Sequence, residues 1–134
     1  MPLVRIDLIE GRTQSQVAAI GECVLRALVE HMNVPERDRF QVITEHAPGR
    51  LVYNRSYLGI ERTDGIVLVQ VTLSKGRTTE QKQAFYAKVA ELLARDAGVR
   101  PGDVTISLIE STREDWSFGD GVAQYLVLPK EQWK

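Results

Sequence analysis

Two short stretches of the chain, Leu3 to Ile9 and Ile66 to Leu73, are apolar or alternate apolar with polar residues. Both are rich in β-branched residues, which suit a pleated surface, so each predicts a β-strand. Each stretch is followed by Gly-Arg-Thr, at Gly11 and again at Gly76, where glycine permits a tight turn and the threonine hydroxyl can cap a helix. Apolar residues then recur every three or four positions, which predicts an amphipathic helix after each strand.

The same order of features continues beyond each helix. Val34-Pro35 ends the first helix and Val99 to Gly102 ends the second, because proline and glycine interrupt helical hydrogen bonding. Apolar stretches follow from Phe40 to Ile43 and from Val104 to Ile109, and each predicts a second strand. Each half of the chain is therefore predicted to be a β-α-β unit.

An internal repeat supports this division. A shift of 65 positions superimposes residues 2–45 on residues 67–110 without a gap, and Gly11-Arg12-Thr13 falls on Gly76-Arg77-Thr78. Under the same shift Asp38 meets Asp103 and Glu45 meets Glu110. We therefore expect one domain over residues 1–134, with residues 46–64 as a linker and residues 111–134 as a C-terminal segment.

The expected fold class is α/β. Right-handed crossovers place both helices on one face of a four-stranded sheet, so the other face needs water or a partner to cover it. Apolar residues interspersed on that face, Leu3, Ile66 and Leu68, favour a partner, and we expect a homo-oligomer. The linker is predicted to be loop with a short strand from Leu51 to Tyr53. The C-terminal segment holds both tryptophans and is expected to fold back onto the body of the domain.

Composition narrows the range of functions. The chain is 43% apolar and 26% charged, with a net charge of −1 and no basic stripe, so neither a nucleic acid nor a membrane is an expected partner. Cys23 lies in the first helical pattern and is expected in the core, and His31 and His46 form no metal-ligand spacing. The sequence shows no export signal, which favours a cytoplasmic location, and we expect no structural zinc.

Pro2 is the most unusual candidate for chemistry. Removal of Met1 would leave Pro2 as a secondary amine at the chain terminus, where an α-amino group titrates near neutral pH. Such an amine could act as a base, as an acid, or as a nucleophile that forms an iminium with an aldehyde. Its counterpart in the second repeat, Val67, has no free amine, so only one half can be catalytic. Alternatively, Pro2 simply begins a strand.

Three further positions could complete a site. Arg77 opens the second helix, where a guanidinium and the helix N-terminus together suit a carboxylate, although a solvated turn arginine has the same pattern. Asp38 could activate water or hold the Pro2 amine in one protonation state, whereas its copy Asp103 argues for a structural role. Trp116 and Phe118 could wall off water or pack in the core.

These residues together resemble the tautomerase superfamily. The resemblance rests on Pro2, the duplicated β-α-β unit, Gly76-Arg77-Thr78 and the segment from Asp115 to Gly119, and it is nearest to the malonate semialdehyde decarboxylases. It implies a trimer in which Pro2 is catalytic, assisted by Asp38, with Arg77 binding the substrate carboxylate. It also implies that Trp116 and Phe118 flank the site. Lys75 stands where some of these decarboxylases have a second arginine, and it presents a point charge in place of a fork.

The implied reaction is decarboxylation of malonate semialdehyde (3-oxopropanoate) to acetaldehyde, and it requires neither a metal nor an organic cofactor. A keto-enol tautomerase acting on a 2-oxo acid such as phenylpyruvate would use the same residues, and hydration of an acetylenic or haloacrylic acid is a related side activity. A third hypothesis is a non-catalytic oligomer in which Arg77 binds an organic acid. Retention of Met1 would favour that hypothesis, because a blocked amine cannot perform proline chemistry.

Overall fold

The structure, a computed structural model, describes residues 2–133 and contains two successive β-α-β units. The first comprises β1 (Leu3–Ile9), α1 (Gln14–Met32) and β2 (Gln41–His46), and the second comprises β3 (Val67–Ser74), α2 (Thr79–Ala97) and β4 (Val104–Ser111). The remaining helical elements are short: η1 (Tyr57–Gly59), η2 (Pro101–Asp103), η3 (Arg113–Asp115), α3 (Gln124–Val127) and η4 (Lys130–Trp133).

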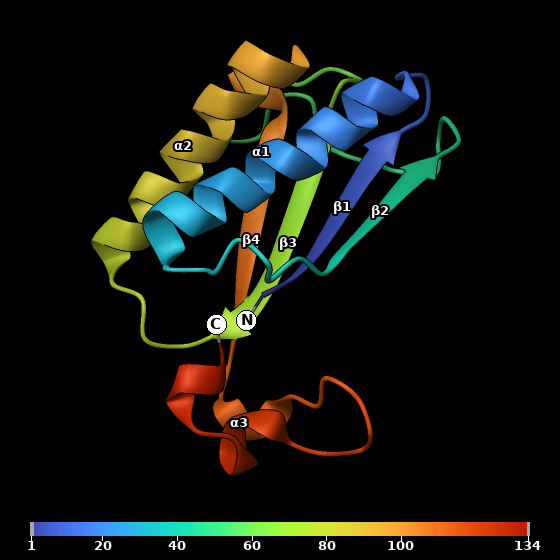
Figure 1. The fold of residues 1–134 in the computed structure, drawn as a ribbon. Coiled ribbons are helices and arrows are strands. Elements are labelled where there is room, and N and C mark those ends of the chain that lie inside the picture. The colour runs from blue at the N-terminus through green and yellow to red at the C-terminus, as the bar shows by residue number, and fades with distance from the viewer. Residues whose placement is uncertain (1, 134) are drawn as a thin grey trace.

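The four strands form one mixed sheet in the order β2-β1-β3-β4. Within each unit the two strands are parallel, whereas β1 and β3 are antiparallel at the centre. Both long helices lie side by side on one face of the sheet and leave the opposite face open (Figure 1). The predicted α/β architecture is therefore confirmed.

Local sequence fixes both helix ends in the same way in the two units. Thr13 and Thr78 cap α1 and α2, and the side-chain oxygen of a glutamine three residues later accepts a hydrogen bond from the cap backbone N–H. The helices end at Asn33 and Gly98, which adopt the left-handed conformation with φ of 55° and 64°. The repeated Gly-Arg-Thr motif thus starts each helix at an equivalent point.

The core lies between the helices and one face of the sheet. In β1 and β3 alternate residues point into it, as the polarity pattern predicts: Val4, Ile6, Leu8, Val67, Val69 and Val71 are all buried. Cys23 is also buried there, in agreement with its predicted place. The largest side chain in the core is Phe85 of α2, which is completely buried.

Three sequence-based expectations need correction. Residues 51–53 form no strand, because this segment of the linker pairs with no neighbour in the sheet. Ile66 does not contribute to the open face, since it lies just before β3 and is buried. The strands β2 and β4 also run farther than predicted, to His46 and Ser111, because backbone pairing continues past the apolar residues.

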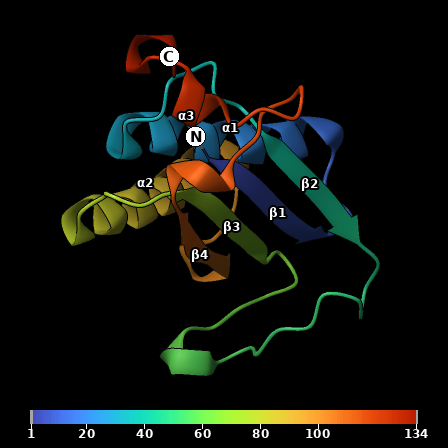
Figure 2. The same cartoon turned by 90° about the horizontal axis from the view of Figure 1, so that it is seen from below.

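The linker and the C-terminal segment lie at opposite ends of the sheet (Figure 2). Since β2 is parallel to β1, the linker leaves at the C-terminal end of β1, where Ile9 pairs with His46. Since β4 runs antiparallel to β1, the C-terminal segment leaves near the N-terminal end of β1. That second end of the sheet also carries Pro2.

Candidate active site

Arg77 is anchored between the two units. Its Nε and Nη2 donate to the carbonyl oxygen of Met32 at 3.0 and 2.8 Å, and Nη1 donates to the carbonyl oxygen of Ser74 at 2.7 Å. These bonds use three of its five N–H donors within the described structure, so each terminal nitrogen keeps one for a ligand. Burial lowers the pKa of the Arg77 guanidinium, whereas Tyr125 and Asp38 act to raise it. The group nevertheless remains a fixed cation at any physiological pH.

The Arg77 side chain lines a cavity of about 520 Å³. Asp38 and Lys75, which were both predicted as site residues, line the same cavity. Two further cations of the C-terminal segment, Arg113 and Lys130, lie on its wall. Four basic side chains and one carboxylate thus face one space, which favours a small organic anion.

Asp38 is 7% exposed and sits in the turn between α1 and β2, where its backbone N–H donates to the carbonyl oxygen of Pro35. Burial raises the pKa of the Asp38 carboxyl, and the positive charge of Arg77 acts in the opposite direction. A carboxyl with a raised pKa can exchange a proton closer to neutral pH than an exposed aspartate can. Asp38 is therefore suited to assist proton transfer.

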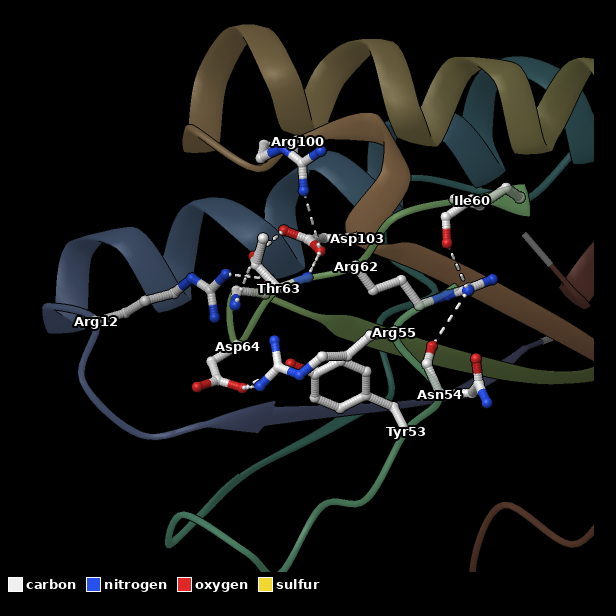
Figure 3. A network of polar contacts seen from close by, with 11 residues as sticks. Arg12, Tyr53, Asn54, Arg55, Ile60, Arg62, Thr63, Asp64, Arg100 and Asp103 are labelled. Carbon is white, nitrogen blue, oxygen red and sulfur yellow. Dashed lines mark hydrogen bonds and ion pairs between the residues drawn. The ribbon is translucent and has the colours of Figure 1, made fainter. Parts of the chain in front are cut away.

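Asp103, the copy of Asp38 in the second unit, has a different environment. It is 2% exposed, and it accepts hydrogen bonds from the backbone N–H and the hydroxyl of Thr63, both at 2.7 Å. Arg100 approaches it at 3.6 Å, and Arg12, the copy of Arg77, donates to the nearby Gly65 carbonyl at 2.6 Å (Figure 3). Residues at the end of the linker thus fill the position in the second unit that corresponds to the cavity beside Asp38, and Asp103 is structural.

Pro2 is buried directly before β1. The strand pairs Val4 with Gln41 and Leu3 with Thr72, so continuing the register sets Pro2 level with Arg39 on one side and Leu73 on the other. It consequently lies one residue along from Asp38 on one side and from Ser74, a partner of Arg77, on the other. The sheet brings together residues that are far apart in the sequence.

The two predicted aromatic residues lie beside this cavity. Trp116 and Phe118 stack with ring centroids 5.6 Å apart, and Trp116 donates from Nε1 to the hydroxyl of Ser111. Phe118 lines an adjoining cavity of about 330 Å³ that also includes Asp38. Trp116 faces a hollow on the open face of the sheet together with Leu3, and it is not among the residues that line the cavity of Arg77.

Tyr125 is a site residue that sequence reasoning did not identify. It lines both the cationic and the adjoining cavity, and its ring meets that of Phe118 edge-on at 5.1 Å. Burial, together with the nearby charge of Asp38, raises the pKa of Tyr125 to about 12 while Arg77 acts in the opposite direction, so the phenol stays protonated at neutral pH. The aromatic composition of the C-terminal segment was the available signal, and the segment contacts the body of the domain where Phe118 packs against Phe40, with ring centroids 6.1 Å apart.

The chain has few other candidates for chemistry. Among residues 2–133, no three His, Cys, Asp or Glu side chains form a group able to hold a metal ion. None of the helices that the structure describes has the length and apolar character needed to cross a membrane.

The fold corresponds to a known family of enzymes. Family models described as tautomerase enzyme match residues 2–57 and residues 38–119, and the chain belongs to the tautomerase family. It is 41% identical over 127 residues to the probable tautomerase YrdN of Bacillus subtilis strain 168, covering 95% of this chain and 98% of that protein. It is 40% identical over 126 residues to the probable tautomerase YusQ of the same organism, covering 94% and 99%.

Solved structures show which members of that family the chain is similar to. A malonate semialdehyde decarboxylase described with decarboxylase and hydratase activities is 38% identical, with a TM-score of 0.87 over 92% of this chain and 95% of that one. The FG41 malonate semialdehyde decarboxylase, solved inhibited by 3-bromopropiolate, is 41% identical, with a TM-score of 0.87 over 95% and 99%. A native fused 4-OT is 20% identical and shares the fold, with a TM-score of 0.74 over 92% and 98%.

Proposed function

We propose that this enzyme of the tautomerase family decarboxylates malonate semialdehyde to acetaldehyde and carbon dioxide, using Pro2 as its amino-terminal catalytic residue. The observation that carries the proposal is the cationic cavity, in which Arg77 and Lys75 face Asp38 at the end of the sheet where Pro2 lies. The similarity to two malonate semialdehyde decarboxylases supports the choice of substrate.

In the proposed reaction Arg77 binds the carboxylate of 3-oxopropanoate through its remaining N–H donors and holds it out of the plane of the carbonyl group. The bond between the carboxylate carbon and the adjacent carbon breaks, and its electron pair forms the carbon-carbon double bond of an enolate. The Pro2 ammonium donates a hydrogen bond to the developing oxyanion, which lowers the barrier because this negative charge is absent from the aldehyde oxygen of the substrate and develops as the bond breaks. Protonation of the terminal carbon then gives acetaldehyde.

A covalent route uses the same residues. Pro2 as a free secondary amine attacks the aldehyde carbon and loses water to form an iminium, which accepts the electron pair as an enamine when carbon dioxide leaves. Protonation at carbon and hydrolysis release acetaldehyde and the amine. In either route Asp38 sets the protonation state of Pro2 or orients water, Lys75 supplies a second positive charge, and Trp116 and Phe118 limit access of solvent.

A keto-enol tautomerase acting on a 2-oxo acid such as phenylpyruvate is the second candidate. The adjoining cavity favours it, because Phe40, Phe118 and Leu128 surround a space next to Asp38 that suits an aromatic ring. In this reaction neutral Pro2 moves a proton between carbon and oxygen while Arg77 binds the carboxylate. The two Bacillus subtilis relatives are named as probable tautomerases, and hydration of an acetylenic acid is a further side activity to test.

The proposed assembly is a homotrimer. The open face of the sheet carries the exposed apolar side chains of Leu3, Val42 and Ile109, which another subunit would cover. Fused 4-OT proteins of the same fold, at about 20% identity, are described as trimers, which supports this number of subunits.

Acetaldehyde formation from 3-oxopropanoate tests the proposal directly, with Pro2→Ala measured alongside the parent protein. We expect turnover that the alanine variant loses while keeping its fold by circular dichroism, because only the secondary amine changes. Intact-mass spectrometry must also find the chain without Met1. Full turnover by Pro2→Ala would reject the mechanism, whereas ketonisation of phenylenolpyruvate with no acetaldehyde would select the tautomerase. Binding of organic acids without either reaction would indicate a non-catalytic module.

A further inference from the structure

The adjoining cavity beside Asp38 has no role in binding 3-oxopropanoate itself. It has a volume of about 330 Å³, and it shares four lining residues with the cationic cavity: Pro35, Asp38, Tyr125 and Trp133. In the proposed reaction Arg77 holds the carboxylate and Pro2 acts at the aldehyde, so both ends of this three-carbon acid are bound. A molecule of that size, held at both ends, has no group left to contact the adjoining cavity.

The wall of the adjoining cavity away from Asp38 is mainly apolar. Three apolar side chains line it without lining the cationic cavity: Phe40, Phe118 and Leu128. Phe118 packs against Phe40 with ring centroids 6.1 Å apart, and it meets Tyr125 edge-on at 5.1 Å. Arg37 and Gln132 also contribute to this wall, and both are exposed, so their polar groups keep their contact with water. The wall therefore suits an apolar group of a ligand.

Hydrogen bonds within the C-terminal segment hold this wall in place. The backbone N–H of Phe118 donates to Oε1 of Gln124 at 2.8 Å, and Nε2 of Gln124 donates to the carbonyl oxygen of Gly119 at 2.8 Å. Nε1 of Trp133 donates to the carbonyl oxygen of Leu128 at 3.2 Å. A wall that is already ordered loses little conformational freedom when it binds an apolar group.

Asp38 lies where the two cavities meet, since it lines both of them. By strand register Pro2 lies one residue along from Asp38, and Arg77 lines the cationic cavity with it. The C-terminal segment that completes the adjoining cavity lies at the same end of the sheet as the start of β1 (Figure 1). C2 of 3-oxopropanoate joins the carboxylate carbon to the aldehyde carbon. With these two groups at Arg77 and Pro2, C2 lies beside Asp38, and a substituent on C2 reaches the adjoining cavity.

We propose that the substrates of this enzyme are 3-oxo acids with an apolar substituent on C2, such as a benzyl group, and that the adjoining cavity binds this substituent. The inference rests on the decarboxylase function proposed above and names its substrate class. The bond between the carboxylate carbon and C2 breaks and carbon dioxide leaves, while the electron pair forms the double bond of the enolate or enamine. Protonation at C2 then gives a substituted acetaldehyde, which for the benzyl compound is 3-phenylpropanal.

The substituent supplies binding energy at a distance from the bond that breaks. One methylene group in a fitted apolar pocket changes kcat/KM by about 10–200-fold. A benzyl group is larger than a methylene group, so an apolar cavity beside C2 should favour the benzyl substrate by at least about tenfold. The carboxylate anchor at Arg77 and the chemistry at Pro2 are the same for both substrates. The ratio of the two kcat/KM values therefore reports on the adjoining cavity.

A comparison of the two substrates tests the inference. Values of kcat/KM are measured for 2-benzyl-3-oxopropanoate and for 3-oxopropanoate, and each aldehyde product is followed through NADH and alcohol dehydrogenase. We expect the parent protein to favour the benzyl substrate by at least about tenfold. Leu128→Asn should lower this ratio by at least about fivefold, because a polar amide replaces part of the apolar wall.

Leu126→Asn is the matched control. It makes the same change two residues earlier, at a side chain of α3 that is 60% exposed and lines neither cavity, so its ratio should equal that of the parent. Leu128 is itself 38% exposed, and its hydrogen bond to Trp133 uses the backbone carbonyl, so both variants should keep their fold. A preference for the benzyl substrate that Leu128→Asn leaves unchanged would overturn the assignment of the adjoining cavity.

Equilibrium binding separates the cavity from the reaction. Malonate and benzylmalonate carry a carboxylate in place of the aldehyde on which Pro2 acts, and their dissociation constants are measured by isothermal titration calorimetry. We expect benzylmalonate to bind the parent at least about tenfold more tightly than malonate does, and this difference to shrink in Leu128→Asn.

The two assays fail in different ways. Decarboxylation of 3-oxopropanoate with no preference for the benzyl substrate and no tighter binding of benzylmalonate would overturn the substrate class and leave the decarboxylase standing. Tighter binding of benzylmalonate without decarboxylation of either substrate would overturn the decarboxylase, and the substrate class with it, in favour of the 2-oxo acid tautomerase.

Discussion

Arg77 and Arg12 form a matched pair for a quantitative test, because the repeat sets them at equivalent positions and only Arg77 faces the cationic cavity. Substitution of each by methionine keeps most of the aliphatic stem and removes the guanidinium. In Arg77→Met three hydrogen bonds to backbone carbonyls disappear, whereas in Arg12→Met one to Gly65 disappears. The expected losses of unfolding free energy are about 2–3 kcal/mol for Arg77 and about 1 kcal/mol for Arg12.

Arg77→Met and Arg12→Met should differ much more in activity than in stability. Loss of the carboxylate anchor should lower kcat/KM for 3-oxopropanoate by about 10²–10³-fold, which corresponds to about 2.7–4 kcal/mol of transition-state stabilisation. Arg12→Met should stay within about threefold of the parent, since Arg12 contacts the linker and does not line the cavity. Acetaldehyde release is followed through an NADH-linked alcohol dehydrogenase, at a temperature where thermal melts show every variant folded.

Arg77→Lys provides the conservative comparison. Lysine keeps the charge and loses the planar fork, so we expect partial recovery of kcat/KM relative to methionine. Equal losses in Arg77→Met and Arg12→Met would show that the wrong unit had been assigned the site. A large loss of stability with unchanged kcat/KM would show that Arg77 only joins α1 to the loop before α2.

Three stability predictions follow from buried groups. Because burial raises the pKa of Asp38, the folded state binds the carboxyl proton more tightly than the unfolded state does. Stability therefore falls as pH rises from the pKa of the unfolded state through the higher pKa of the folded state. Asp38→Asn should therefore melt above the parent at pH 7 and lose that advantage below about pH 3, where the carboxyl is protonated in both states; the same difference at both pH values would contradict this. Asp103→Ala should lower the unfolding free energy by about 1–3 kcal/mol, because Thr63 loses both of its hydrogen bonds to that carboxylate. Thr63→Val should remove only the hydrogen bond from the hydroxyl and so cost less. Equal losses of unfolding free energy for the two variants in urea melts would contradict this prediction. Phe85→Ala should cost about 3–5 kcal/mol in the same assay and Tyr86→Ala much less, and a small effect at Phe85 would mean that the core closes around the deletion.

Much of the fold could be read from local patterns. Alternation in β1 and β3, the Gly-Arg-Thr helix starts and the stops at Val34-Pro35 and Val99 to Gly102 each depend on neighbouring residues, so they are visible in the sequence. The strand expected over residues 51–53 failed because a strand requires a partner, which local sequence does not specify. Leu51 of the linker is buried instead, whereas Val52, Tyr57, Leu58 and Ile60 are exposed.

The candidate site was only partly accessible to the same reasoning. Asp38, Lys75 and Arg77 were chosen from their patterns and from a family resemblance, and they do line one cavity. Tyr125 was missed, because a tyrosine in an irregular segment has no periodic signal. Its place in the site depends on the fold of the C-terminal segment, which sets the Tyr125 ring against Phe118 and in the same cavity as Asp38.

The sequence by itself determined the duplicated β-α-β unit, the face of each strand that is buried and the start of each helix, because these follow from short-range periodicity and capping. The tertiary structure alone decided which of the two equivalent aspartates is structural. Asp103 is saturated by Thr63, 40 residues away along the chain, whereas Asp38 faces a cavity with Arg77. The two aspartates have equivalent places in the repeat but different chemistry, because long-range contacts surround Asp103 whereas Asp38 lines a cavity. No local sequence pattern encodes such contacts.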